Sequence, residues 1–346
     1  MHEQNSGTVP VESTPSPVPH KDRSAGLIVF GILTILLGCL CGLLILLMVA
    51  GQAMAAKNTG APAPISTILP VLSVYGAMAV ALIWLGIGSI MARRWARALL
   101  LIFSWSWLIL GLVMVIVMAF LMPKILANVS SNMTANHPEL PAASMFVGMM
   151  IGMFLFYGVF FVILPAVWTF FYNSRHVKAT CETRDPVTRW TDACPLPVLG
   201  LCLWLVSSVP MMLVMPLAGH CVMPFFGMLL TGLPGALLCL AIAALWGYAA
   251  WRLYKLDVRG WWLILIALCV FMVSGLVTFA QHDMMEMYRL MGYPEAQIEQ
   301  IQKIGLLAGH RMIWLMSFSM LPFLGYLFFV RKFFPPRKSY MAPPAA

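Results

Sequence analysis

The sequence predicts an all-α integral membrane protein with about eight transmembrane helices, arranged as a parallel tandem repeat of two four-helix units. Apolar residues make up 61% of the 346 residues, charged residues make up 10%, and the mean hydropathy is +0.89. A water-soluble fold of this length could not keep such a composition in solution. The apolar runs are continuous and do not alternate with polar residues, so helices are the structures that satisfy their backbone groups in lipid.

Eight apolar runs approach or exceed the roughly 20 residues that a helix needs to cross a hydrocarbon core. They lie near residues 26–50, 66–92, 97–122, 144–172, 196–217, 222–251, 260–281 and 311–331. Apart from residues at their ends, the runs contain no Asp, Glu, Lys or Arg. The first run lacks a small-residue cleavage site placed as a signal peptide requires, so we expect it to be a retained span.

The polar segments between these runs define the expected domains. We expect a disordered Pro/Ser-rich cytoplasmic tail at 1–24, a first membrane unit at 25–172, a cytoplasmic connector at 173–195, a second membrane unit at 196–334 and a cytoplasmic tail at 335–346. The N-terminal tail has almost no apolar surface to bury in exchange for the entropy cost of ordering.

Basic residues gather on one side of the expected spans. Sixteen of the 21 Lys and Arg residues lie at the two ends of the chain and in the 2–3, central and 6–7 connections: Lys21, Arg23, Arg93, Arg94, Arg97, Arg175, Lys178, Arg184, Arg189, Arg252, Lys255, Arg259, Arg331, Lys332, Arg337 and Lys338. The other five are Lys57, Lys124, Arg289, Lys303 and Arg311. The positive-inside rule therefore places both termini and the connector in the cytoplasm. A seven-span alternative would send three of the basic residues to the other side. The net charge is +9, and the basic residues lie at the ends of the apolar runs. This placement indicates that they face the membrane surface and do not bind nucleic acid.

The two halves share local patterns. A Gly-Leu-Val sequence, at Gly111 and at Gly275, lies at a similar distance from a basic entry in each half. A Leu-Pro pair, aromatic residues and a basic stop end both the fourth and the eighth run, from Leu164 and from Leu321. An even number of spans per copy would relate the halves by a pseudo-twofold axis along the membrane normal. The alternative is that Leu, Gly and aromatic residues recur in any membrane protein.

Pairs of glycines four residues apart predict close helix contacts, because glycine lets two backbones approach in lipid. Such pairs occur at Gly38 and Gly42, at Gly148 and Gly152, and at Gly305 and Gly309. The third pair falls in a segment expected at the surface.

The segment 282–309 is expected to form an outer amphipathic pair of short helices, broken near Gly292 and Pro294. A candidate divalent-metal cluster lies in this segment and at the residue that follows it: His282, Asp283, Glu286 and His310. His282 and Glu286 would share one helical face. The alternative, which we favour, is a solvated polar face, because no HExxH-like spacing is present.

The connector contains a second, weaker candidate cluster of soft ligands: His176, Cys181 and Cys194. A closed zinc site needs four ligands and a short Cys-x2–4-Cys pair, which the connector lacks. We therefore expect two reduced thiols that pack the connector. The five cysteines within apolar runs are expected to act as small hydrophobes and to form no disulfide framework: Cys39, Cys41, Cys202, Cys239 and Cys269.

The connector run VKATCETRDPVTRWTDACPLPVLG resembles a string found in uncharacterised bacterial multi-pass inner-membrane proteins, in which Cys-Glu, Asp-Pro, Trp-Thr-Asp and Cys-Pro precede a span. The resemblance covers about 25 residues. It implies a bacterial inner membrane and no particular activity.

Three functions stay open at this point. The first is a non-enzymatic membrane module with a structural, assembly or sensing role, which has the lipid bilayer as its surroundings and a membrane protein or a second copy as its partner. The second is a carrier or channel for a neutral or lipophilic solute, with a polar seam of hydroxyl side chains: Ser207, Ser208, Ser274, Thr278, Ser317 and Ser319. The third, ranked last, is an outer-face metal-dependent enzyme. The chain lacks the GxxxxGK[ST], GxSxG and HExxH motifs, so no catalytic residue or cofactor is assigned.

Overall fold

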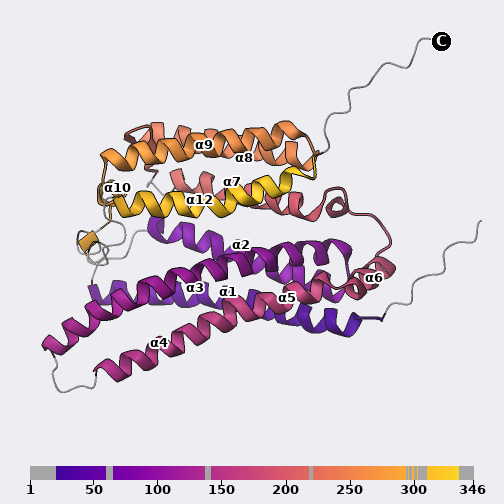
Figure 1. Cartoon of the computed structure of the whole chain (residues 1–346). Helices are drawn as coiled ribbons and strands as arrows, with labels where there is room; N and C mark the ends of the chain where they lie inside the picture. Colours follow the sequence, from indigo (N-terminus) through magenta and orange to yellow (C-terminus); the bar gives the residue numbers. More distant parts are fainter. Residues whose placement is uncertain are drawn as a thin grey trace, which may run out of the picture.

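The computed structural model of the chain describes residues 21–59, 65–136, 142–217, 221–293 and 310–334, together with residues 295, 298, 299 and 302. Long helices run side by side between two ends of the molecule (Figure 1). The connector helix α6 (Arg175–Arg184) lies at one end, and the short helix α10 (Met284–Leu290) lies at the opposite end (Figure 1). These two ends are called the connector end and the hairpin end below.

The first half contains α1 (Ser24–Thr59), α2 (Ile65–Ile90), α3 (Arg94–Asn136), α4 (Ala142–Gly158) and α5 (Leu164–Asn173). A single π turn, η1 (Val159–Ile163), joins α4 to α5. Pro165 is the second residue of α5, and a proline has no N–H to give to a preceding carbonyl. The fourth span therefore contains a local widening of the helix just before the proline.

Glycine allows α1 and α2 to pack closely. A Cβ atom at Gly31 would lie 2.8 Å from the carbonyl oxygen of Gly86, and a Cβ atom at Gly86 would lie 2.7 Å from the carbonyl oxygen of Gly31. Gly38 is similarly close to the Ala79 carbonyl oxygen, at 3.0 Å. The predicted contact at Gly38 is therefore confirmed, and it lies within the first half.

Other members of the predicted glycine pairs make no such contact. A Cβ atom at Gly42, Gly148 or Gly152 would meet nothing within 4 Å among the described residues. The prediction of close contacts at these three positions is therefore wrong within the described chain. Gly305 and Gly309 lie outside the described residues.

The second half contains α7 (Leu196–Leu217), β1 (Met223–Phe225), β2 (Met228–Leu230), α8 (Gly232–Tyr254), α9 (Val258–Gln281), α10 and α12 (His310–Arg331). The two strands form an antiparallel hairpin in which Phe225 pairs with Met228. Phe226 and Gly227 both have positive φ, at 41° and 84°, as a two-residue type I′ turn requires.

The hairpin corrects the expected start of the sixth span. The run beginning at 222 was expected to be helical from its first residue, but α8 begins at Gly232. Apolar residues in the strands made the hairpin indistinguishable by hydropathy from the helix that follows. The two-residue turn also lacks the Asn-Gly or Asp-Gly pair that usually marks such a hairpin.

Each half has its own buried core. In the first half, Tyr172, Leu100 and Leu27 belong to one cluster, which also includes Cys181 of the connector. In the second half, Leu205, Leu253 and other residues form a second cluster. Leu203 packs against both clusters, so the two halves meet along α7.

Seven of the described helical segments are long and apolar enough to cross a membrane. They cover Ser24–Met54, Val71–Ile90, Arg94–Ala119, Gly148–Asn173, Leu196–Pro216, Gly232–Tyr254 and Val258–Gln281. Their outer faces carry large apolar side chains, among them Phe170, which is 79% exposed. Helix α12 has 22 residues, and its segment Met320–Arg331 is a shorter apolar helix.

Candidate functional site

The hairpin is held against α9 by two buried hydroxyl groups. The backbone N–H groups of Phe226 and Gly227 donate to Ser274 Oγ and Thr278 Oγ1, both at 3.0 Å. Ser274 Oγ in turn donates to the carbonyl oxygen of Pro224, at 3.3 Å. Ser274 is 2% exposed and Thr278 is fully buried. The two hydroxyls therefore satisfy turn groups that the apolar surroundings could not.

His282 makes a third contact to the same turn. Its Nε2 lies 3.1 Å from the Gly227 carbonyl oxygen, and its Nδ1 lies 2.9 Å from Glu286 Oε2. Both partners are acceptors, so the arrangement is fully satisfied when both ring nitrogens carry a proton. The Glu286 carboxylate, followed by the Gly227 carbonyl, raises the pKa of His282.

The outer metal cluster expected from the sequence is only partly represented in this geometry. His282 and Glu286 do meet, but not on one helical face as expected: His282 is the extended residue that ends α9, Asp283 is the N-cap of α10, and Glu286 lies in the first turn of α10. His310 begins α12, but its side chain lies outside the described residues. Among the described side chains, no group of three or more His, Cys, Asp or Glu residues could hold a metal ion.

The outer segment itself is partly described. Helix α10 confirms the first of the two expected short helices, and it buries Met285. Most of the expected second helix, after Pro294, falls outside the described residues.

A second polar arrangement lies at the connector end, around the buried Asp185. Its side chain is only 2% exposed, and it forms ion pairs with Arg189 at 2.9 Å and with Arg93 at 3.7 Å. The backbone N–H of Arg94 also donates to Asp185, at 3.4 Å. The hydrogen bond from Arg189 is the main reason that the pKa of Asp185 is lowered. One carboxylate thus ties the connector to the turn between α2 and α3.

Further charges extend this connection. The Arg94 guanidinium lies 3.6 Å from Glu182 and 3.5 Å from Asp192, so it bridges α6 and the short 3-10 turn η2 (Trp190–Asp192). Tyr254, at the end of α8, donates to the Trp190 carbonyl oxygen at 2.9 Å. The connector therefore contacts both halves of the protein. We call the set of Arg93, Arg94, Glu182, Asp185, Arg189 and Asp192 the connector clamp.

The three soft ligands predicted in the connector do not come together. Cys181 belongs to the core of the first half, and Cys194 belongs to the core of the second. His176 accepts a hydrogen bond at Nδ1 from the backbone N–H of Lys21, at 3.4 Å. Burial raises the pKa of both thiols to about 11, so they are protonated near neutral pH. Each cysteine packs one end of the connector.

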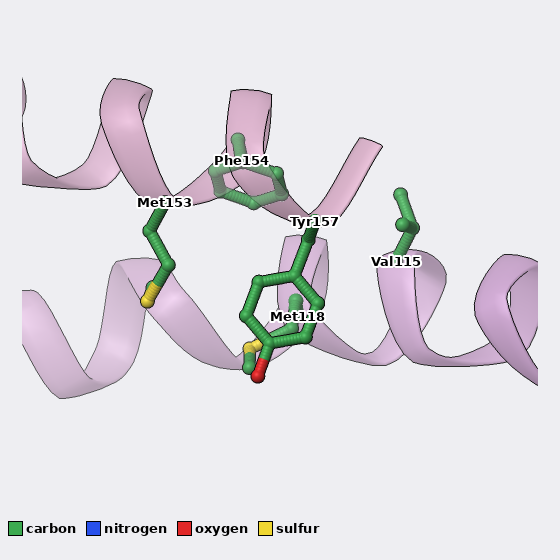
Figure 2. Close-up of a pocket in the computed structure, with 5 residues that line it drawn as sticks. All are labelled: Val115, Met118, Met153, Phe154 and Tyr157. Carbon is green, nitrogen blue, oxygen red and sulfur yellow. The ribbon is translucent and has the colours of Figure 1, made fainter. Parts of the chain in front are cut away.

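A shallow apolar depression lies between α3 and α4 (Figure 2). It is open to the surface and encloses no space large enough for a water molecule. Val115, Met118, Met153, Phe154 and Tyr157 line it, and the tyrosine is the one lining residue with a polar side-chain atom (Figure 2). Such a lining offers no set of converging polar groups of the kind that orients a ligand.

The seam of hydroxyls expected for a solute path is engaged elsewhere. Ser207 and Ser208 donate to carbonyl oxygens of their own helix, those of Trp204 and Leu205. Ser274 and Thr278 hold the hairpin, as described above. The side chains of Ser317 and Ser319 are outside the described residues.

Sequence reasoning missed two features of these arrangements. The burial of Asp185 was missed because an Asp-Pro pair in a polar connector is typical of an exposed turn. The hairpin and its two hydroxyl anchors were missed because Ser274 and Thr278 sit four residues apart in an apolar run, a spacing that also suits an ordinary helix contact. Two hydroxyl side chains four residues apart on one face of the helix were the only sequence feature that could have indicated the hairpin contact.

Comparison with protein-family profiles, with curated proteins and with solved structures finds no match to the chain. The described fold and its lipid-compatible surface define the class of the protein, which is a helical, multi-pass membrane protein. No family is assigned beyond that class.

Proposed function

We propose that the chain is a non-enzymatic membrane module with a structural or assembly role in a bacterial inner membrane. The observation that carries this proposal is that the described polar groups with the best-formed geometry hold the protein's own segments to one another. Ser274, Thr278 and His282 fix the hairpin, and Asp185 fixes the connector. These groups are occupied internally and converge on no open cavity.

The proposed module consists of two four-helix units in the same orientation, which makes α12 the eighth span. The order of pairing supports the repeat, since α1 packs along α2 and α7 packs along α8. The halves also differ, because a π turn precedes Pro165 in the first unit whereas Pro322 lies inside α12 in the second. The hairpin between α7 and α8 belongs to the second unit.

We place both termini and the connector in the cytoplasm. Basic residues surround the connector end, and several lie against aromatic rings, as expected near lipid headgroups. Lys332 Nζ is 3.8 Å from the centre of the Phe329 ring, and the Arg331 guanidinium carbon is 5.2 Å from the centre of the Trp261 ring. The hairpin end then faces the outside.

Fusion reporters test this orientation. A reporter that is active only in the cytoplasm should be active after Lys338, whereas one that is active only outside should be inactive there. Activity of the outside reporter at that position would overturn the orientation.

Native mass spectrometry of the protein released gently from membranes tests the role. A co-purified membrane protein or a defined number of copies supports the module. A retained neutral solute would support a carrier in its place, and a stoichiometric divalent metal would support the outer-face enzyme. The variant Ser274→Ala/Thr278→Ala removes the two hydroxyl groups that anchor the hairpin. If the partner binds at the hairpin end, this variant should retain less of it than the wild type.

A further inference from the structure

Two cysteines meet where the hairpin joins α8. The Sγ atoms of Cys221 and Cys239 lie 2.7 Å apart. Unbonded carbon atoms in contact are about 3.5 Å apart, and sulfur is larger, so the two thiols are closer than ordinary packing allows. A disulfide would bring the two atoms to about 2.05 Å. A small adjustment of the two side chains would therefore be enough to form the bond.

The backbone around the pair is fixed by close packing. A Cβ atom at Gly235 would lie 2.6 Å from the Cys221 carbonyl oxygen and 2.9 Å from the Leu230 carbonyl oxygen. The lack of a side chain at Gly235 thus lets both arms of the hairpin lie directly on the first turns of α8. Cys239 is fully buried and Cys221 is 5% exposed. The contact between the thiols is therefore enforced by the fold.

We propose that Cys221 and Cys239 form a structural disulfide that locks the hairpin to α8. The bond would join residues 18 positions apart and would close the chain across the whole hairpin. It would act together with the Ser274, Thr278 and His282 contacts on the other side of the turn. The hairpin would then be fixed to α8 covalently and to α9 by hydrogen bonds.

The compartment of the two cysteines depends on the orientation proposed above. The pair lies toward the hairpin end, which that orientation places outside the cytoplasm, where disulfides form and persist. The two connector thiols, Cys181 and Cys194, lie at the other end and in separate cores. Among the described residues, the contact between the Cys221 and Cys239 thiols is therefore at the end where oxidation is expected.

A metal site is the main alternative use of two close thiols. Structural zinc needs four ligands, and the described residues provide no third His, Cys, Asp or Glu near the pair. A simple thiol contact is the other alternative. Burial raises the pKa of Cys221, so an unoxidised Cys221 thiol would be protonated and unreactive once the protein has folded.

The oxidant we assign is an extracytoplasmic dithiol–disulfide oxidoreductase in its disulfide form, acting before the hairpin has packed. The Cys221 thiolate attacks one sulfur of the oxidoreductase disulfide, whose S–S bond breaks while a mixed disulfide forms. The Cys239 thiolate then attacks Cys221 Sγ, and the mixed disulfide breaks. The two cysteines lose two protons and two electrons in total, and the oxidoreductase leaves as a dithiol.

Thiol mapping of the full-length protein in its native membrane tests the proposal directly. Membranes are quenched in acid, and free thiols are blocked with N-ethylmaleimide in denaturant before digestion and mass spectrometry. We expect a Cys221 peptide linked to a Cys239 peptide, and two fewer maleimide groups per chain before reduction than after it. The peptides of Cys181 and Cys194 should be alkylated without reduction.

Variants separate the bond from mere proximity. Cys221→Ser should free Cys239 for alkylation, whereas the control Cys269→Ser should leave the linked peptide unchanged. A reductant added under unfolding conditions should lower the unfolding midpoint of the wild type by about 5 °C or more. The same treatment should leave the midpoint of Cys221→Ser/Cys239→Ser unchanged.

Two negative results have different meanings. Alkylation of both cysteines in a chain whose hairpin end is shown by the fusion reporters to face outside would overturn the disulfide and leave the orientation intact. Alkylation of both in a chain whose hairpin end faces the cytoplasm would overturn the proposed orientation and the disulfide together.

Discussion

Asp185 and Arg189 lie four residues apart, and their side chains meet with Arg189 Nη2 2.9 Å from Asp185 Oδ1. The carboxylate is 2% exposed, whereas the guanidinium side chain is 36% exposed. The pair therefore spans the boundary between the packed connector and the solvent. Arg93 reaches the same carboxylate oxygen from the turn between α2 and α3, at 3.7 Å. A loss of the Asp185 charge would thus leave two arginines without their shared partner.

Removing that charge should destabilise the protein. We expect Asp185→Asn to lower the free energy of unfolding by about 2 kcal/mol, because buried hydrogen bonds to a charged group are lost. The control is Asp22→Asn, which removes a carboxylate that pairs with Arg184 at 3.5 Å where both side chains are more than half exposed. The control should change stability by less than about 0.5 kcal/mol. Thermal unfolding in lipid nanodiscs measures both, and equal losses would contradict the buried role of Asp185.

The same carboxylate should make stability depend on acid pH. Its pKa is lowered in the folded protein, chiefly by the hydrogen bond from Arg189. The contribution is therefore fully present above the unfolded pKa, about 3.9, and is lost as the pH falls through the folded pKa. We expect the difference in thermal unfolding midpoint between the wild type and Asp185→Asn to shrink as the pH is lowered from about 5 to about 2. A difference that stayed constant over this range would assign the effect to packing.

The hairpin should respond to pH in the opposite sense. The pKa of His282 is raised, mainly by Glu286, so its stabilising contact is complete below the unfolded pKa, about 6.5, and is lost as the pH rises through the folded pKa. We expect the protection factors of the Phe226 and Gly227 amides against hydrogen exchange to fall as the pH rises above about 6.5 and through the folded pKa of His282. Glu286→Gln should move the fall to lower pH. A pH-independent profile in both proteins would show that His282 does not hold the turn.

Glycine at the α1–α2 crossing should be irreplaceable. A Cβ atom at Gly86 would lie 2.6 Å from Ile35 Cγ1 and 2.7 Å from the Gly31 carbonyl oxygen, and a carbonyl in a helix cannot move aside easily. We expect Gly86→Ala to cost about 1–3 kcal/mol. Gly42→Ala, in the same helix pair, meets nothing within 4 Å and should be neutral or stabilising by up to about 1 kcal/mol. Unfolding of both variants in nanodiscs distinguishes the two positions, and similar effects would contradict the close crossing.

Several elements could be predicted from the sequence because they depend on local hydropathy. The spans near 26–50, 196–217 and 260–281 correspond to α1, α7 and α9, although α1 extends beyond its apolar run. His282 and Glu286 do meet, but the predicted shared helical face is wrong, because His282 is an extended residue between α9 and α10 and only Glu286 is helical. The hairpin at 223–230 could not be predicted in this way, because its strands are as apolar as the helix that follows.

The candidate sites depended more strongly on tertiary packing. Cys181 and Cys194 are near each other in the sequence, but each belongs to the core of a different half. Cys221 and Cys239 are further apart in the sequence, yet the hairpin brings their sulfur atoms together. Side-chain proximity across a turn depends on how the strands lie on α8, which no local pattern encodes.

The sequence by itself determined that this is a helical membrane protein, because the transfer of long uncharged apolar segments into lipid depends on composition alone. It also determined the separation of basic from apolar segments. Only the tertiary structure decided which polar groups are buried, which glycines lie at a crossing and which thiols meet. Those outcomes depend on contacts between residues that are distant in the chain, and the cost of burying each polar group depends on the partner that the fold supplies.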